Sequence, residues 1–235
     1  VDLDIEKGPL NKNGGVNQGY LFYFTKEALK TIQEVQPESS WPEFSIIEGE
    51  SMINNPNLST AEIVDKIKKY IKGKGFTYTD EMIENFYLSL KTKPFVLLAG
   101  ISGTGKTKLV QLFAEAIGCN SENDQFKLIS VKPDWNDSSD LLGYSNIRGD
   151  FQAGPMIKII KHAMENENQP HIVCLDEMNL ARVEYYFSEF LSKMETRRYY
   201  DEKIITDKLL TEEDFEKEND ENEYSGLYIP QNLYI

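Results

Sequence analysis

The chain has no long hydrophobic run, and it has few cysteines and histidines. None of its apolar runs approaches the roughly eighteen residues that a membrane-spanning helix needs, and no signal-peptide pattern opens it. Two cysteines, Cys119 and Cys174, are too few for a disulfide framework. The two histidines, His162 and His171, have no cysteine pair nearby, which argues against a zinc site. We therefore expect a reduced, cytoplasmic protein that does not contact a membrane.

Basic residues are also in deficit. The chain carries 25 Lys and Arg against 39 Asp and Glu, a formal net charge of −14. Because binding over a broad face of a nucleic acid requires a positively charged surface, the composition argues against that role for this chain. Hydrophobic residues make up 40% of the chain, which is enough for a substantial core in one large domain.

A glycine-rich loop is the most informative feature that the chain does contain. Residues 100–107 match the pattern G-x-x-x-x-G-K-[ST], which wraps the phosphates of a nucleotide. An apolar run at 95–99 predicts a buried parallel strand before the loop, and apolar residues at helical spacing predict a helix after it. A strand, a glycine loop and a helix in this order aim backbone N–H groups at an anion. The alternative is a glycine-rich turn that carries a surface lysine.

Each residue of the loop has a physical task. Its three glycines allow backbone angles and close approaches that a Cβ would block. Lys106 can reach the β- and γ-phosphate oxygens, and the Thr107 hydroxyl can bind the Mg²⁺ that bridges them. Ser102 and Thr104 are expected to contribute mainly through their backbone N–H groups. The predicted phosphate-binding residues are Gly100, Ile101, Ser102, Gly103, Thr104, Gly105, Lys106 and Thr107.

A second apolar run, at 171–175, ends in two carboxylates. Asp176, at the carboxyl end of this predicted strand, suits the Walker-B aspartate that holds Mg²⁺ through its water shell. Glu177 suits the base that orients and polarises an attacking water, which favours a hydrolase over a small-molecule kinase. Both predicted strands end at one edge of a parallel sheet, where ligands bind. For this run alone, the alternative is a plain strand followed by a helix cap.

The remaining pattern predicts helices and strands that alternate around these two motifs. Ser59 and Glu62 form a capping box at the start of a helix over 59–72. A second helix over about 80–90 is expected to bury five apolar residues, Met82 among them. Tyr78, between these helices, is expected in the core or near the base of the nucleotide. Further strands are expected at 126–131 and 233–235, a hairpin at 145–154, and helices at 156–164 and 180–194.

Three other segments carry no chemistry in the sequence. The acidic segment 211–223 is predicted to be a mobile surface loop. Tyr199 and Tyr200 lie beside two arginines and are expected at an exposed helix end. Residues 1–57 are an N-terminal segment of unknown role, in which we expect a strand at 20–24 and a helix at 26–35.

Together these motifs resemble AAA+ NTPases of the McrB type, the motor subunits of modification-dependent restriction systems. The similarity covers roughly residues 60–235, and it includes the run from Pro94 to Thr107. A hairpin before the Walker-B strand, expected here at about 145–155, is typical of the branch that holds McrB, MoxR and midasin. The other similar segments are Pro133-Asp134-Trp135 with Asp140-Leu141-Leu142-Gly143-Tyr144, then Gly154-Pro155, and Leu175-Asp176-Glu177-Met178-Asn179-Leu180-Ala181-Arg182.

The resemblance implies an α/β fold, specifically the three-layer α/β/α arrangement of a P-loop NTPase (AAA+) with a parallel central sheet. It assigns residues 58–235 to this NTPase core and leaves residues 1–57 outside it. Family members also have a sensor-1 motif, an arginine finger and a helical lid after the strand that follows Asn232. We therefore expect these three features beyond Ile235.

The resemblance also implies a function. It favours GTP over ATP as the substrate, with Mg²⁺ as the cofactor, in a hexameric ring. The implied partners are an McrC-like nuclease subunit and DNA that is bound through other domains or subunits. Carried over by position, Lys106 and Glu177 are catalytic, and Thr107 and Asp176 serve Mg²⁺. Two alternatives stay open: a MoxR-like ATPase that remodels protein complexes, and a nucleotide-binding assembly module with little turnover of its own.

Overall fold

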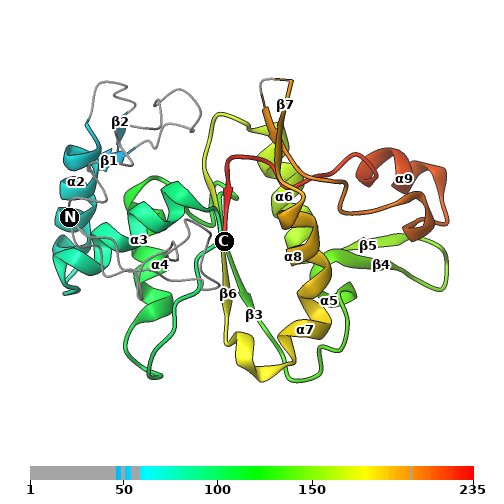
Figure 1. Ribbon diagram of the computed structural model, residues 1–235, viewed down its shortest axis with the longest axis horizontal. Helices are drawn as coiled ribbons and strands as arrows, with labels where there is room; N and C mark the ends of the chain where they lie inside the picture. The colour runs from blue at the N-terminus through cyan, green and yellow to red at the C-terminus, as the bar shows by residue number, and fades with distance from the viewer. Residues whose placement is uncertain (1–45, 49–50, 54–58, 202) are drawn as a thin grey trace, which may run out of the picture. The chain divides into compact units, whose positions relative to one another are not determined.

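The computed structural model describes residues 46–48, 51–53, 59–201 and 203–235 (Figure 1). These residues belong to two compact units, residues 59–106 and residues 107–235, and a short hairpin clusters with the second unit. The hairpin pairs β1 (Ile46–Glu48) antiparallel with β2 (Ser51–Ile53). The strand expected at 20–24 and the helix expected at 26–35 lie outside the described residues. Within the described ranges, no helix is long and apolar enough to cross a bilayer.

Two helices, α2 (Thr60–Gly73) and α3 (Asp80–Thr92), form most of the first unit. The predicted capping box is confirmed, because the Ser59 N–H donates to the Glu62 carboxylate at 2.8 Å and the Glu62 N–H donates to Ser59 Oγ. Lys68 on α2 forms ion pairs with Asp80 and Glu84 on α3. The buried apolar residues are Val64, Ile67 and Ile71 on α2 and Ile83, Phe86, Tyr87 and Leu90 on α3.

Met82 is not in this core, contrary to the prediction. Its side chain is 48% exposed. The buried residues of α3 follow the i, i+3, i+4, i+7 spacing of one helix face from Ile83 onward. Met82 lies at the edge of that stripe, about 100° around the helix from Ile83, and in the first turn of α3, where its side chain is left exposed.

The apolar run 95–99 does not form the strand that its composition predicts. These residues lie outside every sheet of the described chain, and the Leu97 side chain is 37% exposed. A parallel strand is defined by hydrogen bonds to a neighbouring strand, and the described sheets contain no strand paired with this run. Apolar composition indicates that a segment tends to be buried, but it does not supply the partner that makes a strand.

A parallel sheet forms the centre of the second unit. Its strand order is β3 (Phe126–Ser130), β6 (His171–Asp176) and β9 (Leu233–Tyr234), and both pairings are parallel. Figure 1 shows α4 (Lys106–Ala116) on one side of the β3–β6 pair, with α6 (Pro155–Glu165) and α8 (Ser188–Glu195) on the other. This arrangement confirms the predicted α/β fold with a parallel sheet.

The predicted hairpin before β6 is also confirmed. It consists of β4 (Gly143–Ser145) and β5 (Phe151–Ala153), and it follows the short helix α5 (Ser139–Leu142). A Cβ on Gly154 would lie 2.3 Å from the Leu141 carbonyl oxygen, so only glycine fits at the base of this hairpin.

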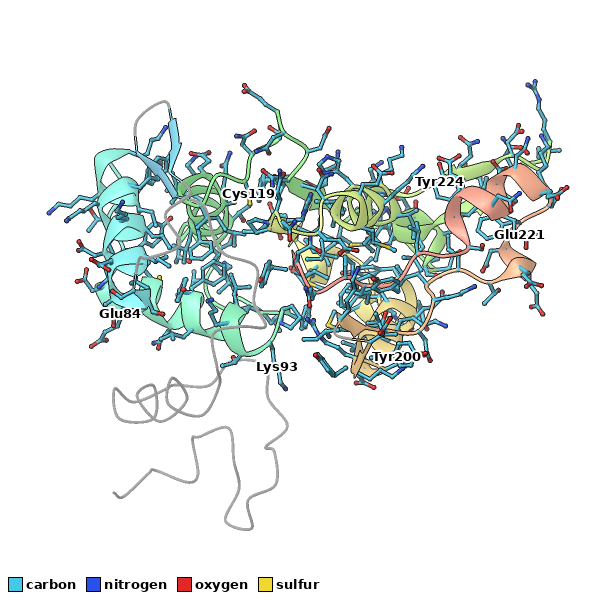
Figure 2. All side chains as sticks on the ribbon, turned by 90° about the horizontal axis from the view of Figure 1, so that it is seen from above. Glu84, Lys93, Cys119, Tyr200, Glu221 and Tyr224 are labelled. Carbon is cyan, nitrogen blue, oxygen red and sulfur yellow. The ribbon has the colours of Figure 1, made fainter. Side chains whose placement is uncertain are left out.

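The acidic segment 211–223 is not the unstructured loop that was predicted. It contains η3 (Glu212–Asp214) and most of α9 (Glu218–Tyr224), and it packs against the β4–β5 hairpin (Figures 1 and 2). The Phe151 ring contacts the rings of Phe215 and Tyr224 at centroid distances of 5.0 and 5.3 Å. Lys217 forms an ion pair with Asp150. Phe215 within the segment and Tyr224 directly after it therefore dock the segment, although its average composition resembles that of a solvated loop.

The helix predicted at 180–194 is broken, and the segment after it is a hairpin. The turn η2 (Met178–Leu180) and the helix α7 (Val183–Tyr186) precede α8, and Phe187 separates the two helices. The Trp135 and Tyr186 rings meet edge to face at 5.3 Å. Tyr199 and Tyr200 lie on β7 (Arg198–Tyr200), which pairs with β8 (Lys203–Ile205), and not at a helix end. Both tyrosines are exposed, and Figure 2 labels Tyr200.

The two histidines form a hydrogen-bonded pair in which His171 is buried and His162 is half-buried. His171 Nδ1 lies 2.9 Å from the Gln169 carbonyl oxygen, which can only accept, so His171 carries its proton on Nδ1. Its Nε2 then accepts a hydrogen bond from His162 Nδ1 at 2.8 Å. Burial lowers the pKa of His171 to about 4, with the hydrogen bond to Gln169 opposing this shift and the nearby His162 acting in the same direction as burial. The pair has a structural role. His171 is the first residue of β6 and Asp176 is the last, so the pair lies at the opposite end of the strand from Asp176.

This pair makes stability depend on pH. The folded chain resists protonation of His171 until about pH 4, whereas the unfolded chain protonates it near 6.5. The contribution of His171 is thus fully present above about pH 6.5 and is lost as the pH falls toward 4, by up to about 3 kcal/mol. Urea unfolding between pH 7.5 and 4 would measure it, with His171→Gln as the non-titrating reference. Parallel stability curves for the two proteins would contradict this prediction.

Candidate phosphate-binding and hydrolytic site

The loop before α4 is shaped by positive backbone angles and by hydrogen bonds to its own carbonyl groups. Gly103 and Gly105 have φ values of +80° and +82°. Lys106 Nζ donates to the carbonyl oxygens of Gly100 and Ile101 at 3.1 and 2.9 Å. The Thr104 hydroxyl also donates to the Ile101 carbonyl oxygen, at 2.9 Å. The lysine ammonium is therefore folded back over the loop, at the position from which it can exchange carbonyl oxygens for phosphate oxygens.

Tyr78 supports this loop from outside it, a contact that the sequence did not predict. Its hydroxyl donates to the Gly105 carbonyl oxygen at 2.9 Å. Sequence reasoning placed Tyr78 in the core or near the nucleotide base, and nothing in its spacing from the loop predicts a contact across 27 residues of chain. The only feature of the sequence that could have indicated this contact is the position of Tyr78 directly before the N-cap of a predicted helix.

The second part of the site lies at the carboxyl end of β6. The Thr107 hydroxyl donates to Asp176 Oδ1 at 2.9 Å, across 69 residues of chain. Ser130 is the register partner of Asp176, and the Val131 N–H donates to the Asp176 carbonyl oxygen at 3.0 Å. The parallel ladder thus fixes the backbone of Asp176, and α4 brings Thr107 to its side chain. Both side chains were predicted to serve one Mg²⁺; the hydrogen bond brings them together, and the metal role stays a prediction.

Glu177 occupies an uncommon backbone conformation. Its φ and ψ are 54° and 41°, in the left-handed region that residues with a Cβ rarely adopt. Its N–H donates to Asp176 Oδ1 at 3.1 Å, and its side chain is exposed. The hydrogen bond stabilises the sharp turn from β6 into η2. A strained backbone conformation persists only where the surrounding structure holds it in place, and such conformations cluster at functional sites.

Lys106 and Thr107 are consecutive residues at the boundary between the two compact units. The residues from Gly100 to Lys106 belong to the first unit, and Thr107, Asp176 and Glu177 belong to the second. Lys106 and Thr107 are also the first two residues of α4. The ammonium group and the metal-directed hydroxyl are therefore neighbours along the chain.

Cys174 takes no part in this chemistry. Burial and the neighbouring Asp176 carboxylate raise the pKa of its thiol to about 12. The thiol therefore stays protonated at neutral pH, and a protonated thiol is neither a nucleophile nor a metal ligand.

The donor set at Thr107 and Asp176 fits Mg²⁺. Both groups present hard oxygen atoms, and in nucleotide sites Mg²⁺ is held by one or two protein oxygens together with phosphates and water. Among the described residues there is no cluster of three or more His, Cys, Asp or Glu that could hold a metal ion. A site that relies on Thr107, Asp176 and the phosphates of a substrate does not require one.

Comparison with known protein families agrees with this geometry. A family model for an AAA domain of the dynein-related subfamily matches residues 95–217, just over half of the chain. The matched span contains the whole loop together with Asp176 and Glu177, and it leaves out Tyr78. No curated protein matches the chain.

Proposed function

The chain belongs to the dynein-related subfamily of AAA domains, a family of nucleotide-hydrolysing P-loop proteins, and from this premise we propose that it is an Mg²⁺-dependent GTPase. The observation that carries the proposal is the 2.9 Å hydrogen bond between the Thr107 hydroxyl and Asp176, with Glu177 directly after it. This contact joins the residue that ends the phosphate loop to the carboxylates at the end of β6.

Each group then has a distinct role. The backbone N–H groups of the loop and the Lys106 ammonium bind and orient the phosphates. Thr107 and Asp176 hold Mg²⁺, which when bound neutralises charge on the phosphate oxygens. Glu177 accepts a proton from the attacking water through its carboxylate. Its side chain is exposed, so the carboxylate can contact water, and its left-handed backbone conformation is of the kind found at functional positions.

We further propose that the chain is a motor core of the McrB type. The β4–β5 hairpin directly precedes α6 and β6, in the position that is typical of the McrB, MoxR and midasin branch. Trp135, Leu141 and Leu142, which lie in the similar segments, are all buried. On this proposal the chain forms hexameric rings and acts with an McrC-like nuclease subunit. DNA is bound by other domains or subunits, as the net charge of −14 favours.

The preference for GTP rests on the resemblance to the McrB type, and on it we expect GTP to bind about ten-fold more tightly than ATP, a difference of about 1.4 kcal/mol. The test is displacement of a fluorescent GTP analogue by unlabelled GTP and ATP, with Mg²⁺ present, followed by measurement of phosphate release. The same titration in EDTA should weaken binding and stop release, because the metal is then removed. Tighter binding of ATP would favour the MoxR-like alternative, and binding without phosphate release would favour the assembly module.

A further inference from the structure

We infer that Tyr78 is a positioning residue for the phosphate loop, which orients the peptide between Gly105 and Lys106 so that the Lys106 N–H faces the bound phosphates. The inference rests on the proposed nucleotide binding and extends the site to Tyr78, a residue that the matched family span leaves out. Its basis is the hydrogen bond of 2.9 Å from the Tyr78 hydroxyl to the Gly105 carbonyl oxygen. The direction of donation is certain, because a carbonyl oxygen only accepts.

The tyrosine ring is seated directly against Gly105. A Cβ on Gly105 would lie 2.9 Å from Tyr78 Oη and 3.6 Å from both Cε1 and Cζ of the ring. Gly105 also has a φ of +82°, a conformation that a side chain would strain. The absence of a Cβ therefore serves two purposes, since it permits the turn and it admits the ring of Tyr78.

Tyr78 is itself held by the start of α3. The next residue, Thr79, is the N-cap of this helix, and its hydroxyl accepts a hydrogen bond from the Met82 N–H at 3.3 Å. The buried stripe of α3 and the ion pairs of Lys68 fasten α3 to α2. Burial raises the pKa of the Tyr78 hydroxyl, so it remains a donor throughout the neutral range. The hydrogen bond thus comes from a rigid support.

The geometry of a peptide group connects this hydrogen bond to phosphate binding. In a trans peptide the C=O of one residue and the N–H of the next point in opposite directions. Because the Gly105 carbonyl points to Tyr78, the Lys106 N–H points away from Tyr78. Lys106 is the first residue of α4, so its N–H is one of the N-terminal groups that have no partner within the helix and bind anions. A flipped peptide would instead present a carbonyl oxygen to the phosphates.

Tyr78→Phe is expected to weaken the binding of GTP and of ATP by the same factor, about five-fold, the loss expected for one hydrogen bond. The base should not matter, because the hydroxyl acts through a phosphate-facing N–H. KM should rise by the same factor while kcat stays unchanged, the signature of binding that is equal in the ground and transition states. Titration with fluorescent GTP and ATP analogues, together with steady-state phosphate release, measures both effects.

Tyr70→Phe, the same chemical change on α2, is the matched control and should bind both nucleotides like the wild-type protein. Hydrogen exchange of the nucleotide-free chain gives a second readout, in which Tyr78→Phe should speed exchange at residues 103–106 while the melting temperature stays unchanged. Unchanged affinities and exchange in Tyr78→Phe would overturn the inference. So would weaker binding of GTP alone, which would make Tyr78 a base contact. If the wild-type chain binds neither nucleotide, the proposed function fails, while the exchange rates still decide the role of Tyr78.

Discussion

Replacing Lys106 with alanine should abolish nucleotide binding at concentrations at which the wild-type chain is saturated. The Lys106 ammonium is the positive side chain of the loop, and it already donates to the Gly100 and Ile101 carbonyl oxygens. Phosphate oxygens carry full charge, so they are stronger acceptors than these carbonyls. Two charge-assisted hydrogen bonds, at about 1.5–3 kcal/mol each, correspond to a loss of at least about 100-fold in affinity. Titration with a fluorescent GTP analogue in the presence of Mg²⁺ measures it.

The control for this experiment is Lys108→Ala. Lys108 lies two residues further along α4, and its ammonium donates to Gln111 Oε1 at 3.1 Å. The variant therefore removes a lysine from the same helix without removing a group assigned to the phosphates. It should bind nucleotide within about two-fold of the wild-type chain, as expected for a half-buried side chain outside the phosphate loop. Lys106→Met retains most of the aliphatic stem without the charge, and it should behave like the alanine variant. If Lys106→Met bound nucleotide normally, the role assigned to the ammonium would be wrong.

The local features of the fold were predictable from the sequence. The Ser59–Glu62 capping box depends on residues three positions apart, and it was correct. The parallel strands β3 and β6 were correct as well, because short apolar runs bounded by polar residues have few alternatives in an α/β chain. The two motifs assigned Thr107 and Asp176 to one Mg²⁺; the structure brings their side chains into hydrogen-bond contact, and their roles at the metal stay a prediction. Where a short span of sequence determines the structure, the prediction was confirmed.

Two of the errors have a different cause, which is dependence on distant partners. The run 95–99 has the composition of a strand, yet a strand exists only when another strand pairs with it. The acidic segment that contains Phe215 was predicted to be a loop from its average charge, and its structure depends on Phe151, which lies on another hairpin. The Tyr78–Gly105 hydrogen bond is a contact of the same kind. Periodicity and composition contain no information about such pairs.

Glu177→Gln should bind nucleotide like the wild-type chain and lose hydrolysis. The amide retains the size of the carboxylate and cannot accept a proton from water, so the expected loss in single-turnover phosphate release is about 100-fold to 10,000-fold. Binding survives because the contact of Glu177 with Asp176 uses the backbone N–H, which the substitution leaves in place. Release of phosphate from pre-bound, labelled GTP measures the chemical step, and equilibrium titration measures binding.

The Glu177→Gln substitution should leave the backbone conformation at position 177 unchanged. Glutamate and glutamine have the same Cβ, so the left-handed conformation at φ 54° is strained equally in both proteins, and the turn into η2 should be unchanged. Glu184→Gln makes the same chemical change at an exposed position on α7, and it should hydrolyse GTP at the wild-type rate. Loss of binding in Glu177→Gln would indicate that the side chain shapes the site. Full hydrolysis by the same variant would show that another group activates the water.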